Sequence, residues 1–266
     1  MLLDDIIKDV ALVTVIENNN DNKNSKTLGT QRKYFDESLR CFESWRKFYP
    51  KIKIYAICPT KATLSEKEIN QLQDLDVIYL EKYFPETEDF KYGFFNVPLV
   101  MSWAEDNLKE KIFIHTDLDM ILLRKLNDSL FKPVLEKKII CGKYDENARK
   151  SQRVDFDTGF TIHLKGLKFY QYFWKKVKNI LENKDLPSNI LEYDTEEYAM
   201  EQIAKEGVFS ICPIEKYQLG EGYPSIDTFN DDEVKNVYFW HEHLVNDKKE
   251  ELIKEKIKYS KRLRNL

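Results

Sequence analysis

The sequence predicts an α/β protein with a mostly parallel mixed sheet flanked by helices. In its N-terminal half, short apolar runs rich in β-branched residues alternate with longer stretches of helical period, an order that indicates βαβ units. Only eight Gly and eight Pro occur among 266 residues, so the chain is globular and not of low complexity. After about residue 125 the pattern changes to shorter strands and long helices.

Each expected element follows from its local pattern. The strand-like runs combine Val, Ile, Tyr and Phe, whereas the helical stretches repeat apolar residues three and four positions apart. The first half predicts strands at 11–17, 53–59, 77–83 and 111–117, and helices at 31–48, 64–73 and 96–108. The second half predicts strands at 139–144, 154–164, 208–214 and 237–243, helices at 167–181 and 195–206, and a charged helix at the end.

The organisation expected is one catalytic-type domain over residues 1–246, followed by a charged C-terminal helix over 247–266. A chain of this length can bury most of the apolar surface that its unfolded form exposes, so a catalytic cleft is structurally feasible. The sequence shows no internal repeat and no long linker.

Two carboxylates interrupt an apolar stretch in the middle of the chain. Asp117 and Asp119 follow the strand-like KIFIH and precede a second apolar run, MILLRKL. Because a buried strand needs apolar side chains, these residues should lie where the strand emerges, at the edge where open α/β sheets bind ligands. Side chains two positions apart share a face on extended backbone, so both carboxylates can hold Mg²⁺ or Mn²⁺ for a phosphate-bearing ligand.

The same spacing occurs twice more, so its context decides its meaning. Asp74 and Asp76 precede a predicted strand, at the amino edge of a parallel sheet, and we interpret them as helix-end and turn residues. Asp155 and Asp157 lie near the start of the predicted strand 154–164.

Charge and cysteine usage limit the partners and the compartment. The net charge of −4 argues against a general nucleic-acid binder. The four cysteines are far apart and form no CxxC pair, which indicates buried thiols in a reducing compartment. The N-terminus has no signal pattern and no apolar run approaches about 18 residues, so we expect a soluble, cytoplasmic protein.

The basic tail has two interpretations. Residues 248–266 contain eight Lys or Arg against three Glu, and four apolar residues fall near helical spacing: Leu252, Ile253, Ile257 and Leu263. The tail can lie on an anionic membrane surface, as a peripheral contact with the inner face of a membrane, or pack one apolar stripe on the body. We favour packing on the body.

The order of these features resembles the nucleotide-sugar glycosyltransferases of the A-type fold, most closely the glycogenin and bacterial galactosyltransferase type. The resemblance covers residues 11–243: a parallel α/β half ending in an apolar strand plus Asp-x-Asp, then FDTGF, an acidic helix start, and a late apolar strand ending in His. It implies a single Rossmann-like domain, a nucleoside diphosphate sugar as donor, expected to be a UDP-sugar, and Mn²⁺ or Mg²⁺ as cofactor.

The resemblance assigns roles residue by residue. Asp117 matches a residue that contacts the donor ribose and the metal, and Asp119 matches a direct metal ligand. The family motif Phe-Asn-x-Gly-aliphatic stands here with Asp157 in place of Asn and with Gly159 kept. An ionised Asp157 accepts hydrogen bonds from sugar hydroxyls but cannot donate them, so this departure bears on the donor sugar more than on the fold.

An acidic helix start supplies further candidate carboxylates. Glu196 and Glu197 stand where the family places an acidic motif near the donor sugar, and with Asp157 they are the candidate catalytic residues. A second interpretation stays open, in which Asp194 or Thr195 caps the helix and the helix dipole favours both glutamates.

The family's third metal ligand is a His after a late strand. Here VYFW leads into His241 and His243, which share a face on an extended chain, so either imidazole can reach the cation while the other contacts phosphate. The family's following Lys-Pro-Trp is absent, so Lys216 or a lysine of residues 23–33 would have to meet the diphosphate.

The remaining histidines and one glycine-containing segment have other interpretations. We assign His115 and His163 to packing or turn hydrogen bonds. Residues 217–225 carry two glycines beside aromatics and are a candidate lining of the diphosphate or acceptor cleft.

These features combine into metal-dependent transfer of a sugar to a hydroxyl of a glycan or of a lipid-linked or protein acceptor. Spacing does not separate a retaining from an inverting enzyme, which needs a carboxylate base. Three alternatives stay open: a haloacid dehalogenase-type phosphatase, although its Asp-x-Asp follows the first strand instead of about the fourth; a nucleotidyltransferase; and a non-catalytic sugar-nucleotide or glycan-binding domain.

Overall fold

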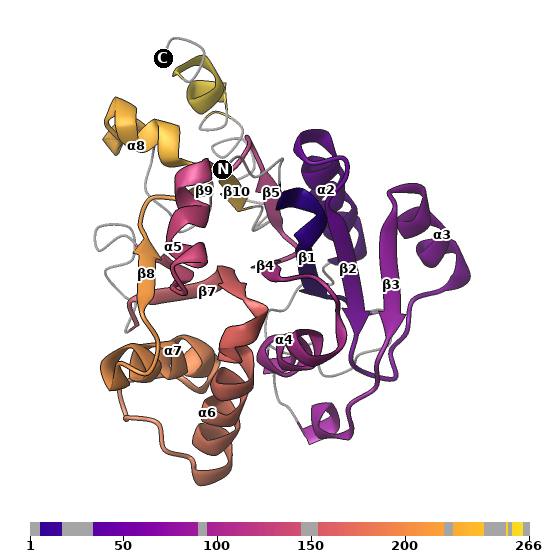
Figure 1. Cartoon of the computed structure of the whole chain (residues 1–266), viewed down its shortest axis with the longest axis vertical. Coiled ribbons are helices and arrows are strands. Elements are labelled where there is room, and N and C mark those ends of the chain that lie inside the picture. The colour runs from indigo at the N-terminus through magenta and orange to yellow at the C-terminus, as the bar shows by residue number, and fades with distance from the viewer. Residues whose placement is uncertain are drawn as a thin grey trace.

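The computed structural model describes residues 6–17, 34–89, 95–144, 154–220, 226–241, 254 and 257–262. Within them a seven-stranded sheet has the order β3-β2-β1-β4-β7-β6-β8 (Figure 1). Its strands are β1 (Val10–Val15), β2 (Lys53–Cys58), β3 (Val77–Glu81), β4 (Ile112–Thr116), β6 (Ile139–Lys143), β7 (Phe156–Leu164) and β8 (Ile211–Ile214). The predicted α/β class with a mostly parallel mixed sheet is confirmed.

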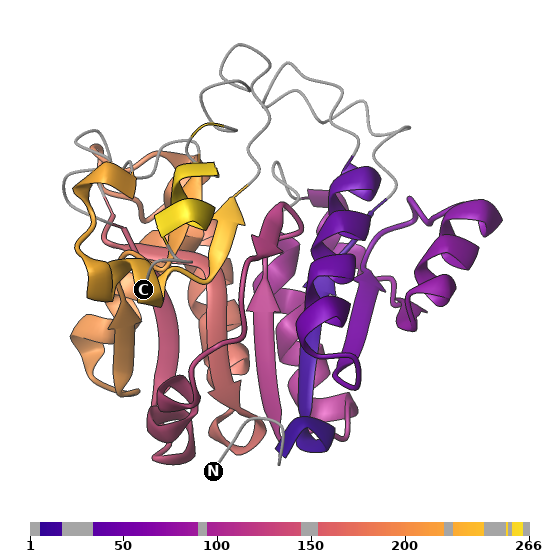
Figure 2. The same ribbon diagram turned by 90° about the horizontal axis from the view of Figure 1, so that it is seen from above.

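One strand makes the sheet mixed. Strand β7 is antiparallel to both of its neighbours, β4 and β6, whereas the other neighbouring pairs are parallel. Figure 2 shows β7 running opposite to β4. Because β7 returns beside β4, the first half of β7 lies next to the end of β4, where Asp117 follows.

Helices cover both faces of the sheet because the strands bury both faces. Val10 and Leu12 of β1 belong to one core, and Ala11 and Val13 belong to the other, as the two-residue period of a strand requires. The first core includes side chains of α2 (Tyr34–Phe48), α3 (Glu66–Asp74) and α5 (Phe131–Leu135). The second includes side chains of α4 (Asn96–Asn107), α6 (Phe169–Asn183) and α7 (Thr195–Glu206), which gather on the opposite side of the sheet in Figure 1.

The strand order places a topological switch point between β1 and β4. The chain moves outward from β1 through β2 to β3, then returns to the other side of β1 as β4. The crossover helices change face at the same step, because α2 and α3 pack in one core and α4 in the other. A crevice at the carboxyl ends of β1 and β4 is the place where open α/β sheets bind ligands.

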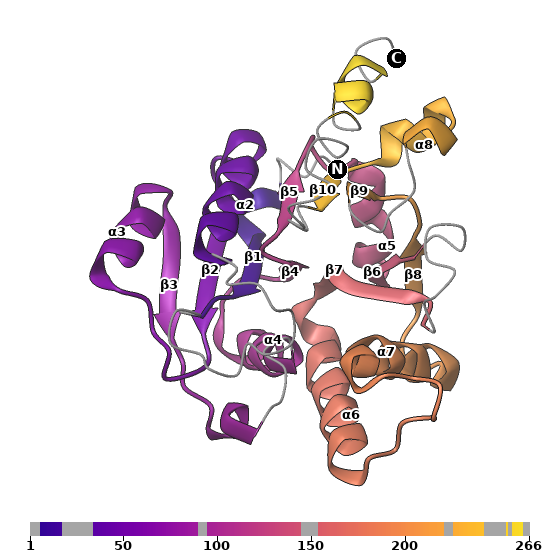
Figure 3. The same cartoon turned by 180° about the vertical axis from the view of Figure 1, so that it is seen from behind.

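A second, three-stranded sheet lies beside the end of β4. It has the order β5-β10-β9, with β5 (Met120–Leu122) directly after Asp119, β9 (Gln218–Gly220) and β10 (Phe239–His241) (Figure 3). Leu219 and Trp240 pack in an outer cluster with residues of the segment that contains α8 (Asp231–Asn236), while Phe239 faces inward, 4.8 Å from Phe160 between ring centroids. The alternation fixes which side chains of this sheet face the main one.

The described part of the tail contacts the body through Tyr259, a residue outside the apolar stripe expected from the sequence. Tyr259 is buried in the outer cluster, and its hydroxyl donates to the carbonyl of Val237 at 3.2 Å. Lys258 and Arg262 form ion pairs with Asp227 and Asp231 at 2.5 and 2.8 Å. Ile257 is half exposed, whereas Leu252, Ile253 and Leu263 lie outside the described residues.

The other boundaries differ little from expectation. Strand β8 begins at Ile211 instead of residue 208, and β9 was not predicted as a strand. Asp74 ends α3 and Asp76 adopts a positive φ of 53°, so their interpretation as helix-end and turn residues is confirmed. None of the helices in the described part of the chain is both long enough and apolar enough to span a membrane.

The burial of the cysteines gives a direct test of the packing. Cys41, Cys58 and Cys141 are buried and Cys212 is partly exposed, and burial raises the pKa of Cys41 to about 12 and that of Cys141 well above its ordinary value. Since the thiolate is the reactive form, we expect a thiol-disulfide reagent to label Cys212 alone in the native protein and all four thiols in guanidinium chloride. Spectrophotometric thiol counting checks this, with Cys212→Ser as the control that removes the fast reaction. Rapid labelling of two or more thiols would contradict the packing.

Candidate functional site

Asp117 is held by its backbone at the end of β4. Its amide donates to the carbonyl of Gly159 at 2.9 Å, which continues the pairing of β4 with β7 by one residue. The carboxylate stays accessible, because 45% of the side chain is exposed, with Oδ1 3.6 Å from Nε2 of His115. The predicted position of Asp117 at the carboxyl edge of the sheet is therefore confirmed.

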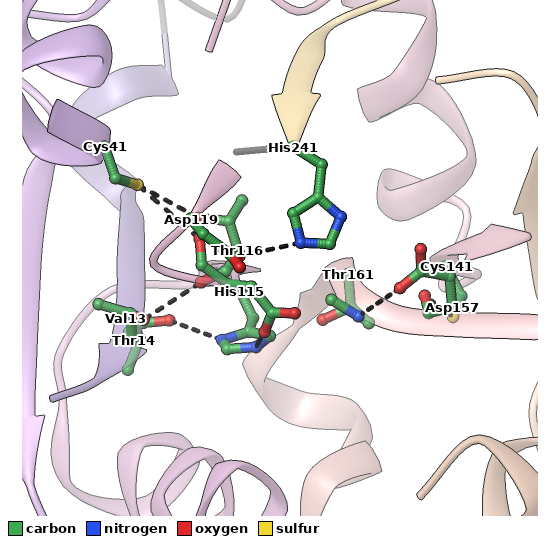
Figure 4. A network of polar contacts seen from close by, with 12 residues as sticks. Val13, Thr14, Cys41, His115, Thr116, Asp119, Cys141, Asp157, Thr161 and His241 are labelled. Carbon is green, nitrogen blue, oxygen red and sulfur yellow. Dashed lines mark hydrogen bonds and ion pairs between the residues drawn. The ribbon is translucent and has the colours of Figure 1, made fainter. Parts of the chain in front are cut away.

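Asp119 meets His241 across the small sheet. His241 pairs with Met120 in the antiparallel β5-β10 ladder, and this register places Nε2 of His241 3.0 Å from Oδ1 of Asp119 (Figure 4). Both side chains are about nine-tenths buried. Burial alone lowers the pKa of His241, but the charge of Asp119 and the hydrogen bond with it, together with Asp157 and Asp117, raise that pKa to about 9.

Asp157 lies at an irregular step of the main sheet. Thr161 pairs with Cys141 of β6, but Asp157 pairs with Gly142, so β7 advances four residues while β6 advances one. Such bulges re-aim side chains and are frequent beside active sites. The two carboxylate oxygens of Asp157 accept hydrogen bonds from the amide of Gly159 at 3.0 Å and from Nε2 of Gln218 at 2.6 Å.

Gly159 brings two of these carboxylates together. A Cβ at this position would stand 2.6 Å from Oδ2 of Asp117 and 3.0 Å from Oδ1 of Asp157. Real Cβ atoms do not approach oxygen so closely. The absence of a side chain therefore lets the carboxylates of Asp117 and Asp157 approach the same point.

The start of α7 adds two glutamates, as the sequence predicts. Glu196 is buried, and burial first, then the charges of Asp117 and Glu197, raises its pKa well above its ordinary value. Glu197 accepts a hydrogen bond of 2.6 Å from the hydroxyl of Tyr144. Asp194 occupies the N-cap position, but no side-chain cap bond forms there, so side-chain capping does not explain the acidic start of α7.

Other predicted residues have different surroundings. Lys216 forms an ion pair of 2.6 Å with Glu233 of α8, so a role toward diphosphate requires it to change partner. His243 and residues 23–33 lie outside the described residues. His115 contacts the carbonyl of Val13 at 3.1 Å, and His163 is buried among aromatic rings with Nε2 3.0 Å from Oε1 of Glu105, surroundings that agree with their interpretation as packing or hydrogen-bonding residues.

The chemistry of the donors suits a hard divalent cation, although the geometry is incomplete. Among the described residues no group of three His, Cys, Asp or Glu side chains is arranged to hold a metal ion. Asp119 and His241 do supply a carboxylate oxygen and an imidazole nitrogen 3.0 Å apart, with the accessible Asp117 two residues before. Oxygen and imidazole nitrogen are ligands that Mn²⁺ accepts.

Two further polar contacts were not predicted from the sequence. Gln218 bonds to Asp157, and Glu17 at the end of β1 accepts a hydrogen bond from Asn96 at the start of α4. Glu17 carries a signal, because it is a charged residue at the end of the first predicted apolar strand; burial raises its pKa. Gln218 falls within residues 217–225, which the sequence indicates as a candidate cleft lining, but its bond to Asp157 could not be predicted, since the two residues are 61 positions apart.

Comparisons with known proteins bear on the fold. No family model matches the sequence, and no curated protein matches it. The structure of galactosyltransferase LgtC with donor and acceptor sugar analogs aligns with a TM-score of 0.50 and 10% identity over 79% of this chain and 76% of that one.

Two other glycosyltransferase structures align less well. That of GlyE from Streptococcus pneumoniae TIGR4 aligns at a TM-score of 0.48 and 12% identity, over 76% of this chain but only 44% of that chain. A glycosyltransferase involved in the glycosylation of the major capsid of PBCV-1 aligns at 0.47 and 12% identity, over 91% and 97% of the two chains. The alignment with LgtC shows that the fold of this chain is one found in the A-type glycosyltransferases.

Proposed function

We propose that the chain transfers a sugar from a nucleoside diphosphate sugar, with a UDP-sugar as the first candidate, to a hydroxyl of a glycan or other acceptor. The observation that carries the proposal is the contact between Asp119 and His241 beside Asp117, at the switch point of the sheet. Long-range pairing brings an acidic pair and an imidazole to the edge where α/β sheets bind ligands. The fold shared with LgtC supports the same reaction class.

In this proposal Asp117, Asp119 and His241 hold Mn²⁺ or Mg²⁺. The cation, when bound, supplies Lewis acidity toward the leaving diphosphate. Asp157 accepts hydrogen bonds from the sugar in addition to those from the side chain of Gln218 and the amide of Gly159, because a carboxylate has about four acceptor positions. In this proposal the three residues at the switch point bind the cation that contacts the diphosphate, and Asp157 binds the sugar.

For an inverting reaction, Glu196 is the best candidate base among the three proposed carboxylates. Burial raises its pKa, which brings a carboxyl group closer to the pH at which proton transfer is efficient. Glu197 already accepts a hydrogen bond from the hydroxyl of Tyr144, so one of its oxygens is engaged within the protein. A retaining reaction needs no such base.

A thermal-shift panel tests the proposal. The ligands are UDP, GDP, CDP and ADP, the corresponding nucleotide sugars and the nucleoside triphosphates, each with and without Mn²⁺. We expect one diphosphate and its sugar to raise Tm only with Mn²⁺, by roughly 5–10 °C at a hundredfold excess over Kd. Stabilisation by triphosphates alone would indicate a nucleotidyltransferase. Stabilisation without donor turnover would indicate a binding domain, and no shift at all would contradict the proposal.

A further inference from the structure

Gln218 lies on the same face of the small sheet as His241. In the parallel β9-β10 ladder Gln218 pairs with Phe239, and His241 is two residues further along β10. The intervening residues Leu219 and Trp240 pack in the outer cluster, so Gln218, Phe239 and His241 face the main sheet. From this face His241 reaches Asp119, and Gln218 reaches Asp157.

The side-chain amide of Gln218 forms hydrogen bonds through its nitrogen but not through its oxygen. Nε2 donates to Oδ2 of Asp157 at 2.6 Å and to the hydroxyl of Tyr217 at 2.9 Å, which takes both of its N–H groups. The carbonyl oxygen Oε1 is buried and has no hydrogen-bond partner within the structure described. A buried carbonyl without a donor is rare in folded proteins and calls for an explanation.

The orientation of this amide is fixed by its neighbours. Exchanging Oε1 and Nε2 would set a carbonyl oxygen against the carboxylate of Asp157, which is repulsive. Tyr217 holds the other bond in place, because its ring stacks on Phe160 at 5.6 Å and lies against Gly142, where a Cβ would stand 2.4 Å from the hydroxyl oxygen. Asp157 and Tyr217 therefore fix the orientation of the amide in which Oε1 is the atom left to accept a hydrogen bond.

We propose that Gln218 determines donor specificity, with Oε1 accepting a hydrogen bond from a hydroxyl of the transferred sugar next to Asp157. The inference rests on the proposed glycosyltransferase function and assigns a further residue of its donor site. A sugar hydroxyl is a donor of the right kind, and Asp157 and Oε1 together present acceptors only. Such a pair selects a sugar with a free hydroxyl at the position it reads, and it disfavours analogues that lack the hydroxyl.

Gln218 is buried, and so are two of the residues proposed to hold the cation, Asp119 and His241. Gln218 is 2% exposed, while Asp119 and His241 are 8% exposed each. A ligand that reaches the proposed cation pair must therefore open the site around all three residues.

Calorimetric binding to the full chain with Mn²⁺ tests the proposal. The probes are UDP and GDP, then UDP-glucose, UDP-galactose, UDP-N-acetylglucosamine and GDP-mannose, and finally the four monodeoxy analogues of the sugar that binds. The variants are Gln218→Met, Gln218→Glu and the control Gln73→Met, which makes the same change at an exposed position of α3. We expect Gln218→Met to weaken the nucleotide sugar about tenfold and the diphosphate less than twofold.

The deoxy analogues distinguish direct binding of a sugar hydroxyl by Gln218 from a purely structural role of this residue. One analogue should bind wild type about tenfold more weakly than the parent sugar nucleotide, and this penalty should vanish in Gln218→Met. In Gln218→Glu the new carboxyl group shares a proton with Asp157 and still presents an acceptor oxygen. This variant should therefore keep the roughly tenfold binding penalty of the deoxy analogue. Equal weakening of diphosphate and nucleotide sugar, or an unchanged penalty for all four analogues, overturns the role of Gln218. Absence of any binding by wild type overturns the proposed function itself.

Discussion

Asp119→Asn is expected to reduce the rate of sugar transfer at least a hundredfold while the protein stays folded. Asparagine keeps the size of the side chain and can still contact His241, but it lacks the charge needed to hold a divalent cation. Loss of one preorganised electrostatic contact to the reacting charge costs about 10²–10³ in kcat. The measurement is release of the nucleoside diphosphate at saturating donor and Mn²⁺, with Tm recorded on the same preparation.

The chain provides its own control for this substitution. Asp76 is the second acid of another Asp-Leu-Asp, but it lies in the turn after α3, at a positive φ that asparagine tolerates. Asp76→Asn should therefore leave both the rate and Tm close to wild type. A fully active Asp119→Asn protein would remove Asp119 from the proposed cation site, and equal losses in both variants would indicate an effect unrelated to that site.

These two copies of one tripeptide show how much of the site could be predicted from sequence. Asp117 and Asp119 were found because an apolar strand precedes them, and the position of that strand in a parallel sheet fixes the edge where they emerge. Asp74 and Asp76 were set aside by the same reasoning, because a strand follows them. Burial and chain direction, both readable in the local pattern, were sufficient here.

The partners of these acids could not be predicted in the same way. His241 and His243 are equivalent by sequence, and it is the pairing of His241 with Met120 that brings one of them to Asp119. Strand β9 has three residues, too few for a periodic signal, yet it brings Gln218 to Asp157. Contacts of this kind depend on the register of short strands far apart in the chain, which local propensity does not determine.

The irregular step between β6 and β7 limited the sequence prediction for another reason. The motif at 156–160 predicted a strand with a functional Asp157, and β7 does contain it. The sequence did not show that the register shifts beside Gly142, where the ring of Tyr217 leaves no room for a Cβ. Two glycines on neighbouring strands thus have different functions, since Gly142 admits an aromatic ring and Gly159 admits two carboxylates.

This difference makes Gly159→Ala the second substitution with a large expected effect. The added methyl group meets Oδ2 of Asp117 and Oδ1 of Asp157 at 2.6 and 3.0 Å, and both atoms belong to side chains. Asp117 can swing aside because its side chain is 45% exposed, so the fold should survive with Tm changed by a few degrees at most. The displaced carboxylates should lower kcat/KM at least tenfold, and up to about a hundredfold if a reacting group moves by 1 Å.

Two alanine substitutions give this experiment its reference points. Gly166→Ala meets no atom within 4 Å, so it should leave activity and Tm unchanged. Gly142→Ala meets the backbone carbonyl of Asp157 at 2.8 Å as well as Tyr217, and backbone cannot move aside cheaply, so Tm should fall together with activity. Among these three glycine variants, Gly159→Ala is therefore the one expected to lose activity with little change in Tm. If Gly159→Ala keeps full activity, the approach of Asp117 and Asp157 has no part in catalysis, and the sugar must bind elsewhere on the sheet edge.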